Sequence, residues 1–393
     1  MIVLQLTSDY IPDPLWGMGW HVKFLTQALR KKDITVYVGT SSKSKDVDKM
    51  TLTTSPDIDK SYLSNQSYEI FNNFEDFLTW QKCLGREIIK RGIIPNIIHC
   101  HNWMSWLTAV EIKKKYPKSK IVSTIHLLQK QYDTMIENPI PSHHEEIIKI
   151  ENEMLLNSDY IILQSYPQLE MIESKYTGLK DHTKIRIIPS GVDFNPKTFE
   201  EVYHKKIANP FIDMVFVGRI ERDKGIYQTL EAFSILSKRY KNIRLHVLGR
   251  GSKLLELSNK FISKNIIFHG FVDRNLLKEI LEKSFIFCLP SSSESFGNSV
   301  IEAMTYGVVP IFSKGENIPI LFKEDFHGLN VPLKLKNGKY SVDTRDIVQK
   351  MEILINDKKL LNKFSLRAYN FSKVTYSIDA MTEKILNVYT EIL

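Results

Sequence analysis

Short apolar runs alternate along most of this chain with longer segments in which apolar residues recur at helical spacing. Short runs rich in Val, Ile and Phe are typical of buried parallel strands. They lie at residues 2–6, 34–38, 96–101, 120–125, 159–165, 185–188, 213–217, 244–248, 266–268 and 285–289. The helical segments between them lie at 20–32, 74–91, 104–115, 142–157, 227–239, 252–263, 273–283 and 296–306. Repeated strand–helix units predict an α/β protein with two doubly wound domains.

The pattern also suggests where the domains meet. Residues 194–211 carry no periodic pattern, so we expect a linker there. We place an N-terminal domain at 1–200, a second domain at 201–375 and a last helix at 376–393. Residues 128–142 also lack a period, and we expect a loop there that could cover a ligand.

Composition fits a folded protein with an uneven charge. The chain has 393 residues, 43% of them hydrophobic, which suffices for two or three domains with real cores. Residues 1–200 hold 24 basic and 24 acidic side chains, so the net charge of +8 lies wholly in the second half. A basic half suits an anionic ligand, a membrane surface or a nucleic acid, although a solvated lysine-rich surface explains most such excesses.

The cysteines and the first residues of the chain indicate the cellular compartment in which we expect the protein. Cys83, Cys100 and Cys288 form no Cys-x-x-Cys pair, which favours reduced side chains and a cytoplasmic protein. The first residues are typical of a strand rather than a signal peptide. No window approaches ~18 apolar residues, so we expect no membrane-spanning helix.

Two carboxylates mark the strongest candidate site. Glu294 lies in the loop that follows the apolar run 285–289, and Glu302 lies eight residues later in the predicted helix. The helix start between them offers free N–H groups to an anion. This segment could hold a phosphate by its backbone and hydroxyl-rich groups by its two carboxylates. Two surface glutamates at this spacing by chance are the alternative.

Two cations follow another strand. Arg219 and Lys224 occupy the loop that runs from Gly218 to Gly225, after the strand at 213–217. A guanidinium and an ammonium at the carboxyl end of a parallel strand suit a diphosphate. A surface loop with unrelated cations is the alternative.

Glycines and histidines add weaker signals. Gly17 and Gly19 lie between a strand and a helix, where glycine lets a backbone approach a phosphate or simply makes a tight turn. His99 and His101 point to the same side of a predicted strand, but no nearby side chains complete a metal site. His126 ends the strand at 120–125, and a histidine at that place is a better candidate for a ligand site than for the core.

The segment Glu294-Ser-Phe-Gly-Asn-Ser-Val-Ile-Glu302 resembles the Glu-x7-Glu signature of the retaining glycosyltransferases of family 4. Gly218-Arg219-x4-Lys224-Gly225 resembles a second motif of that family. Four departures from the family pattern are Trp16 in place of a turn glycine, Asn102 and Leu127 each in place of an acid, and Ser190 in place of Asn. The resemblance implies the GT-B fold, with two Rossmann-like domains facing a cleft and a C-terminal helix that crosses back to the first domain.

The resemblance also implies roles for individual residues. Arg219 and Lys224 would stabilise the leaving diphosphate, Glu302 would take the ribose hydroxyls, and Glu294 would hold the sugar near the anomeric carbon. His126 would line the sugar and acceptor side, with His101 and Trp16 on the acceptor side. The other donor-binding residues would be Gly17, Gly19, Phe271, Val272, Phe296, Gly297, Asn298 and Ser299.

The resemblance therefore implies a retaining transferase that moves a hexose-type sugar from a nucleotide-diphosphate sugar, UDP- rather than GDP-linked, to a hydroxyl. The acceptor would be a glycan, a lipid-linked molecule or a small molecule. No Asp-x-Asp pair stands where a metal-dependent transferase would need one, so we expect no metal and no cofactor. A nucleotide-sugar epimerase and a non-catalytic nucleotide-sugar sensor are the alternatives.

The charge pattern bears on two further classes of partner. No stripe of alternating aromatic and basic residues indicates a nucleic-acid site. The run Lys113-Lys-Lys115 at a predicted helix end is typical of a solvated terminus, but it could also rest on anionic lipid at the inner face of a membrane.

Overall fold

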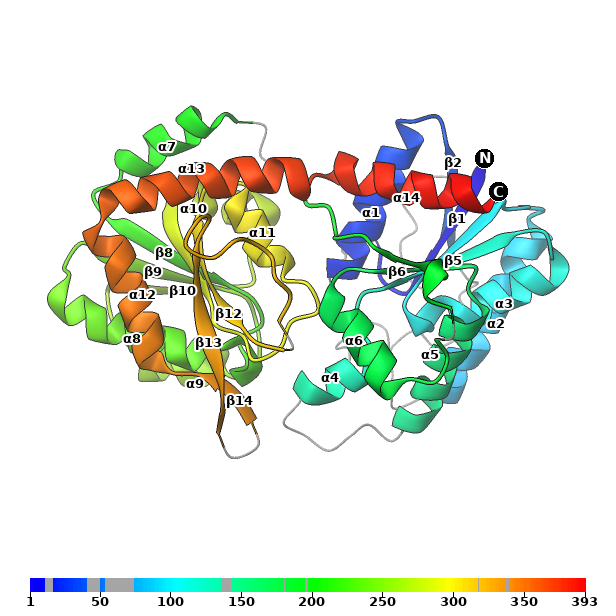
Figure 1. The fold of residues 1–393 in the computed structure, drawn as a ribbon, viewed down its shortest axis with the longest axis horizontal. Helices are drawn as coiled ribbons and strands as arrows, with labels where there is room; N and C mark the ends of the chain where they lie inside the picture. The colour runs from blue at the N-terminus through cyan, green and yellow to red at the C-terminus, as the bar shows by residue number, and fades with distance from the viewer. Residues whose placement is uncertain are drawn as a thin grey trace. The chain divides into compact units, whose positions relative to one another are not determined.

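A computed structural model of the chain describes residues 1–10, 17–40, 50–53, 74–135, 143–179, 181–194, 197–316, 318–336 and 339–393. The chain divides into two compact units (Figure 1). Unit 1 comprises Met1–Gly191 together with Ile378–Leu393, and unit 2 comprises Val192–Ser377. The last helix therefore belongs with the N-terminal unit, as expected.

Unit 1 is built on a parallel sheet with the strand order β3-β2-β1-β4-β5-β6-β7. Its strands are β1 (Ile2–Thr7), β2 (Thr35–Thr40), β3 (Thr51–Thr53), β4 (Ile97–His101), β5 (Lys120–Ile125), β6 (Tyr160–Leu163) and β7 (Ile185–Ile187). The order reverses direction at β1 and β4, which is the arrangement that places ligands at the carboxyl ends of strands.

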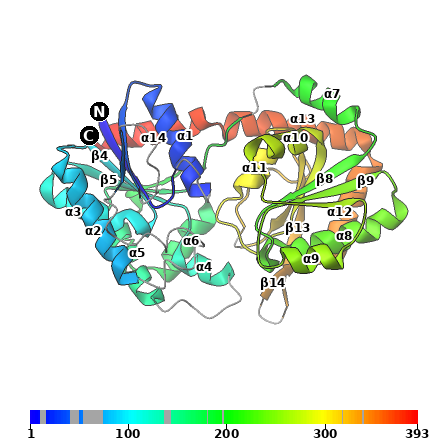
Figure 2. The ribbon, with the colours of Figure 1, turned by 180° about the vertical axis from the view of Figure 1, so that it is seen from behind.

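Helices cover both faces of this sheet (Figures 1 and 2). The helices α1 (Gly17–Arg30) and α14 (Ile378–Ile392) lie on one face; α2 (Phe74–Lys90), α3 (Trp106–Lys115) and α5 (His144–Asn157) lie on the other. Successive residues of β1 alternate between two cores: Val3 packs in the α1/α14 core and Leu4 in the core beneath α2 and α3. Burial on both faces explains why the strands appear in the sequence as nearly continuous apolar runs.

Unit 2 repeats this plan with the order β10-β9-β8-β11-β12-β13-β14. All described pairings are parallel except β13–β14. The strands are β8 (Ile212–Val217), β9 (Ile243–Leu248), β10 (Ile266–Gly270), β11 (Ser284–Leu289), β12 (Val309–Lys314), β13 (Leu329–Lys336) and β14 (Lys339–Val342).

The helices of unit 2 also form two layers (Figure 2). One layer holds α8 (Ile226–Arg239), α9 (Leu254–Lys260) and α12 (Thr344–Asn356). The other holds α7 (Phe199–Ile207), α10 (Arg274–Lys283), α11 (Asn298–Met304) and α13 (Lys358–Thr375). Both units are thus doubly wound α/β structures, as predicted. Among the described helices, none is long and apolar enough to span a membrane.

Three expectations differ from the structure. The expected linker at 194–211 contains the helix α7, whose start is fixed by a capping box in which the side chains of Thr198 and Glu201 each bond the other's backbone N–H. The unit boundary follows Gly191 rather than residue 200, because Val192 bonds to the backbone of Tyr376 in unit 2. The expected loop at 128–142 begins with the helix α4 (Gln129–Met135), and residues 136–142 lie outside the described part of the chain.

Candidate active site

The two cations predicted from the sequence lie at the carboxyl end of β8, in the loop that leads into α8. Arg219 Nη2 lies 2.6 Å from the Asp223 carboxylate, and Lys224 Nζ lies 3.8 Å from the same carboxylate. Gly225 ends the loop in the left-handed region, with φ of 69°, and a Cβ there would lie 2.3 Å from the carbonyl oxygen of Pro290. The loop is therefore packed tightly against the end of β11.

Glu294 comes from the loop after β11 and meets Lys224 directly. Its Oε1 lies 2.7 Å from Lys224 Nζ and accepts a hydrogen bond of 2.8 Å from the Ser291 hydroxyl. Both ionic side chains are 11% exposed. Arg219, Asp223, Lys224 and Glu294 thus form one connected cluster with two charges of each sign, and we call it the 219–294 cluster.

Asp223 is a member of this cluster that sequence reasoning missed. Its backbone carbonyl accepts hydrogen bonds from the Ser292 amide at 2.7 Å and the Ser292 hydroxyl at 3.2 Å, which join the two loops. Burial raises the pKa of the Asp223 carboxyl above its ordinary value, and the nearby Lys224 and Arg219 oppose that rise. Asp223 is visible in the sequence as an acid within the Gly-Arg-x4-Lys-Gly loop. It was not predicted as a site residue because a carboxylate has no evident role beside an expected phosphate site.

The start of α11 lies next to Glu294. Gly297 precedes the helix with φ of 94° and, as a glycine, has no side chain to cap the first turn. The buried oxygens Ser293 Oγ and Asn298 Oδ1 have no hydrogen-bond partner among the described residues. Phe296 packs its side chain in the core against Tyr376, so what it offers a ligand is its backbone. Unpartnered polar atoms of this kind are consistent with a polar ligand beside Gly297–Ser299.

Glu302 lies inside α11 and is paired with a cation from α10. Arg274 Nη2 lies 2.9 Å from Glu302 Oε1 and 3.6 Å from the carboxylate of Asp193, to which Lys278 also comes within 3.3 Å. Burial raises the pKa of Glu302, and the charge of Arg274 opposes this rise. Glu302 was predicted from its motif, whereas Arg274 has no local motif and was not predicted.

Phe271 and Val272 follow β10. Phe271 is 66% exposed and lies under the guanidinium of Arg250, which is 4.4 Å from the ring centre. Val272 packs against the core of unit 2. An exposed ring held by a cation suits a flat ligand, whereas Val272 contributes mainly to packing.

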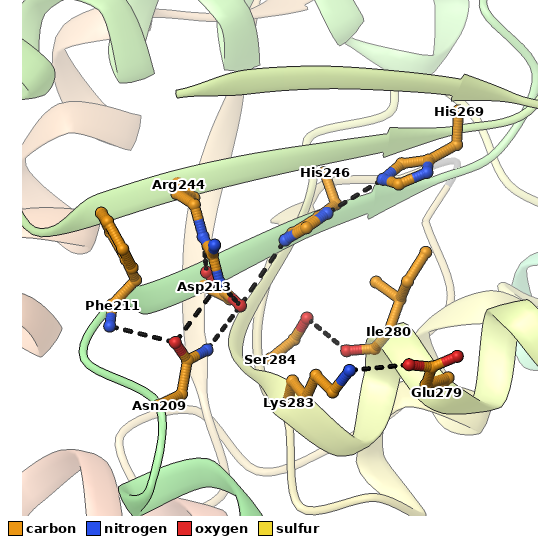
Figure 3. Close-up of polar contacts among 10 residues, drawn as sticks. All are labelled: Asn209, Phe211, Asp213, Arg244, His246, His269, Glu279, Ile280, Lys283 and Ser284. Atoms are coloured by element: carbon orange, nitrogen blue, oxygen red, sulfur yellow. Dashed lines mark hydrogen bonds and ion pairs between the residues drawn. The ribbon is translucent and has the colours of Figure 1, made fainter. Parts of the chain in front are cut away.

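A polar network connects side chains of the neighbouring strands β8, β9 and β10 (Figure 3). The buried Asp213 of β8 is held by two hydrogen bonds from Arg244 at 2.7 and 2.8 Å, and it lies 3.5 Å from Nε2 of His246. His246 Nδ1 in turn lies 2.9 Å from Nε2 of His269 in β10. Burial lowers the pKa of His269, and its neighbour His246 lowers it further. This network fixes the end of β10, two residues before Phe271.

In unit 1, one backbone N–H of the turn at Gly17–Gly19 is already hydrogen-bonded within the protein. The Gly19 amide donates a 3.2 Å hydrogen bond to the carboxylate of Asp9, so in this structure it is not directed at a ligand. Gly17 is exposed at the first position of α1. Trp16 lies outside the described residues.

Four histidines gather in the interior of unit 1. His126 lies at the carboxyl end of β5, His99 and His101 lie in β4 with their rings stacked 4.4 Å apart, and His21 lies in α1. His101 Nδ1 is 3.0 Å from His126 Nε2, and the rings of His21 and His126 meet edge to face at 4.7 Å. Three of these residues were candidates from the sequence, but His21, which is far from the others in the chain, was not.

Asn102 explains how His126 is placed. Its Oδ1 accepts hydrogen bonds from the backbone N–H of His126 at 2.6 Å and of Leu127 at 3.4 Å. Asn102 itself has a positive φ of 62°, which is strained for a residue other than glycine. The amide that replaces the expected acid therefore holds the end of β5.

A metal is the alternative use for this cluster. Ligand atoms of His21, His101 and His126 all lie within 4.8 Å of one another, and the rings are buried. However, His101 and His126 direct their facing nitrogens at each other at hydrogen-bond distance. The described residues are therefore arranged as a hydrogen-bonded chain, and a metal would have to break it.

Comparison with known proteins agrees with the two-unit architecture. A model described as Glycosyltransferase Family 4 matches residues 16–195, and one described as Glycosyl transferases group 1 matches residues 200–371. The chain belongs to the family 4-like glycosyltransferases.

Named relatives agree with this glycosyltransferase assignment. A glycogen synthase of Mycobacterium tuberculosis is 24% identical over 327 residues, which cover 78% of this chain and 76% of that one. The structure of sucrose-phosphate synthase from Thermosynechococcus elongatus has a TM-score of 0.78 at 17% identity, covering 100% and 98% of the two chains. Anabaena HepE in complex with UDP and glucose has a TM-score of 0.71 at 12% identity and 100% coverage of both. These likenesses confirm the predicted two-domain GT-B fold.

For a glycosyltransferase, the two sets of residues differ in chemical character. The 219–294 cluster and Glu302 offer fixed cations and carboxylates, which suit charged groups and hydroxyls. The histidine cluster of unit 1 is buried, and burial lowers the pKa of His126 well below its usual range. The histidine cluster therefore provides neutral, hydrogen-bonded side chains rather than charged ones.

Proposed function

We propose that this glycosyltransferase moves a hexose-type sugar, with retention of the anomeric configuration, from a nucleotide-diphosphate sugar to a hydroxyl acceptor. The observation that carries the proposal is the 219–294 cluster, in which Lys224 contacts the first glutamate of Glu-x7-Glu directly and Arg219 is joined to Lys224 through Asp223. UDP is favoured over GDP as the nucleotide because the similar HepE structure holds UDP and glucose.

In this proposal the residues of unit 2 bind the donor. Arg219 and Lys224 exchange their carboxylate partners for the diphosphate and stabilise the negative charge that develops as it leaves. The Asn298 and Ser299 amides assist, Glu302 takes the ribose hydroxyls, and Phe271 lies against the base. The leaving oxygen of the diphosphate accepts the proton of the attacking hydroxyl on the same face of the sugar, which gives retention.

Glu294 has two successive roles: it pairs with Lys224 before the donor binds, and it contacts the sugar afterwards. It is ion-paired with Lys224 in this structure, and a diphosphate that draws Lys224 away leaves the carboxylate to the sugar. There it accepts hydrogen bonds from sugar hydroxyls and stabilises positive charge at the anomeric carbon. We assign His126 to the sugar side of the site, where it stays uncharged because burial lowers its pKa, so it adds no repulsion to that charge.

The first test is nucleotide release from a panel of UDP-, GDP- and ADP-sugars, with the wild type beside Lys224→Ala. We expect slow hydrolysis of one donor, reduced about 100- to 1,000-fold in the variant, as for loss of a charge that stabilises a transition state. Arg222→Ala is the matched control, since Arg222 lies in the same loop but places its guanidinium over the Tyr227 ring at 4.3 Å. Equal loss in both variants would contradict the proposal.

Product analysis separates the remaining alternatives. The anomeric proton of the product should show the configuration of the donor, and inversion would refute the mechanism above. Conversion of the donor to an epimer without acceptor would indicate an epimerase, and binding without release in the presence of acceptor extracts would indicate a sensor. We expect full activity after treatment with a chelator, and its loss would contradict a metal-independent reaction.

The proposed setting is the cytoplasm, and for a lipid-linked acceptor we propose peripheral contact with an anionic membrane. The three cysteines are free, and burial raises the pKa of Cys100 and Cys288 to about 12, which suits inert thiols. The basic end of α3 is partly engaged by the protein: Lys114 pairs with Glu111, and Lys113 bonds the carbonyl of Ser119. Co-sedimentation with anionic and neutral vesicles tests the membrane contact.

A further inference from the structure

A continuous chain of buried polar side chains joins His126 to the C-terminal helix within unit 1. His126 Nε2 lies 3.0 Å from His101 Nδ1, and His101 Nε2 lies 2.7 Å from the Oε1 of Gln5. The amide nitrogen of Gln5 donates to the hydroxyl of Tyr389 on α14 at 3.3 Å. Tyr389 Oη lies 2.6 Å from Nδ1 of His99.

Both ends of the chain are anchored. At one end, Nε2 of His99 lies 2.7 Å from the hydroxyl of Thr124 in β5. At the other end, the amide nitrogen of Gln164 lies 2.9 Å from His126 Nδ1 and 2.7 Å from the hydroxyl of Ser190. Tyr389 is thereby connected to His126 through two side chains, Gln5 and His101, all of them buried.

Donor and acceptor roles along the chain follow from its ends. An amide N–H of Gln164 can only donate, so Nδ1 of His126 accepts and the His126 proton lies on Nε2. That proton is donated to His101 Nδ1, which places the His101 proton on Nε2, where it meets the carbonyl oxygen of Gln5.

The same direction continues to the end. The Gln5 amide donates to Tyr389, whose hydroxyl donates to His99 Nδ1, and His99 Nε2–H donates to Thr124. Every link has one donor and one acceptor. The direction reverses only if the Gln5 and Gln164 amides both turn over, so the chain changes as a unit.

We propose that Tyr389 is a positioning residue of the transferase, which fixes the orientation and the tautomer of His126 through Gln5 and His101. Without the Tyr389 hydroxyl, the Gln5 amide loses an acceptor and is free to turn. Its NH₂ group can then face His101 Nε2, which forces the His101 proton onto Nδ1 and removes the acceptor of the His126 proton. The inference rests on the proposed place of His126 beside the sugar.

The surroundings of the chain support a neutral state throughout. His99, His101 and His126 are 0–8% exposed. Burial lowers the pKa of His99 to about 3, and it lowers the pKa of His101 and His126 well below their usual range. A neutral His126 with both nitrogens engaged does not act as a base, which agrees with proton transfer to the leaving diphosphate instead.

The test compares Tyr389→Phe with a matched control in the same unit. Tyr160→Phe also removes a hydroxyl that contacts α14, because Tyr160 Oη bonds Glu391 at 3.1 Å, but it lies outside the histidine chain. In protein labelled with nitrogen-15 at histidine, each variant is examined by NMR for the protonation of each ring nitrogen, with signals assigned by single substitutions. This readout needs neither donor nor acceptor.

We expect the wild type to show His99, His101 and His126 as single neutral tautomers with the proton on Nε2. Tyr389→Phe should shift or mix the His101 and His126 tautomers, while Tyr160→Phe leaves them unchanged. With the donor identified above, kcat of Tyr389→Phe should fall about tenfold with KM nearly constant, within the ~100-fold that a misplacement of about 1 Å can cost.

Several results would overturn the inference. The first is a wild type whose histidine rings are doubly protonated, bound to metal or protonated on Nδ1. The second is a Tyr389→Phe variant with unchanged His101 and His126 signals. The third is a Tyr160→Phe variant that changes these signals as much as Tyr389→Phe does. If Tyr389→Phe does not fold, Gln5→Met interrupts the chain without removing the tyrosine and should give the same shift in His126. If the wild type proves not to be a transferase, only the kinetic arm is lost, and the nitrogen spectra still decide on the chain.

Discussion

A buried ionisable side chain can make the stability of this protein depend on pH. Glu151 of α5 is 1% exposed, and it accepts hydrogen bonds of 3.0 and 3.2 Å from the backbone N–H of Gln129 at the start of α4. It also bonds the hydroxyl of Tyr176. Burial raises the pKa of Glu151 to about 8, and these hydrogen bonds only partly oppose the rise.

A raised carboxyl pKa gives a pH dependence of definite sign. The unfolded carboxyl has a pKa of about 4.3, so between roughly pH 4.5 and 8 the folded chain binds a proton that the unfolded chain has lost. The free energy of unfolding therefore falls as pH rises through this window, by up to ~1.4 kcal/mol for each pH unit, and levels off above it.

Glu151→Gln should remove this dependence, because the amide stays neutral in both states. We expect the wild type to lose stability relative to Glu151→Gln between pH 5 and pH 8, as measured by urea unfolding of both proteins at each pH. All other titrating groups are common to the two proteins, so the difference isolates Glu151. A difference that stays constant over this range would show that the carboxyl has an ordinary pKa.

At the scale of secondary-structure elements, the 219–294 cluster depends on how closely two loops approach. Gly225 joins the short helical turn Arg222–Lys224 to α8 with φ of 69°, and a Cβ at this position would lie 2.3 Å from the backbone oxygen of Pro290. Neither the turn nor the end of β11 can accept a side chain there without shifting.

Gly225→Ala should therefore reduce both stability and activity. Gly270→Ala is the matched control in the same unit, because Gly270 has φ of 66° but no atom of the described residues within 4 Å of a Cβ. Both variants carry the cost of a left-handed alanine, about 1 kcal/mol, and Gly225→Ala adds ~1–3 kcal/mol for the clash. Thermal unfolding measures the difference, and nucleotide release should fall in Gly225→Ala because Lys224 moves. Equal destabilisation of the two variants would refute the close approach.

The elements themselves were largely predictable, for a physical reason. Strands buried on both faces, such as β5 and β11, leave continuous apolar runs, and helices packed on one face leave a period. The helix α7 was missed because it has only nine residues, which is too short for a clear helical period, and its capping box of Thr198 and Glu201 was a signal not used. The expected loop after residue 128 was wrong at α4 for a similar reason, because the seven-residue sequence of that helix is mostly polar.

The candidate site was predictable only where local motifs exist. Arg219, Lys224, Glu294 and Glu302 lie in short segments of fixed spacing, and the structure places the first three of them in one cluster. Arg274 pairs with Glu302 from 28 residues away. His21 reaches Ser190 across 169 residues, and no local pattern announces a contact of that range. Partners brought together by sheet topology could not be read from the sequence.

On the scale of the whole molecule, the chain leaves unit 1 after Gly191 and returns to it at Ile378. Unit 2 is thus one continuous segment, whereas unit 1 is assembled from two. The returning helix α14 buries Met381, Ile385, Val388 and Tyr389 in the core that also contains Val3 of the central strand β1. Its residues therefore contribute to a domain whose strands all lie far away in sequence.

This arrangement predicts different behaviour for the two halves when they are produced separately. Fully burying an aliphatic side chain contributes about 1.5–3 kcal/mol, so the loss of α14 removes an amount comparable with the roughly 5–15 kcal/mol that stabilises a typical domain. We expect the fragment 192–377 to unfold cooperatively by itself. The fragment 1–191 should be far less stable and should gain stability when a peptide of residues 378–393 is added.

Urea unfolding followed by circular dichroism measures each fragment, and titration with the peptide measures its binding. A peptide in which Ile385 and Val388 are both replaced by Asp is the control, because these side chains are 0% and 2% exposed in unit 1. Tight binding of the natural peptide together with no binding of the control would show that α14 completes the core of unit 1. If the fragment 1–191 were as stable with the peptide as without it, the helix would be an attachment rather than a part of the domain, and the path from Tyr389 to His126 would lose its structural basis.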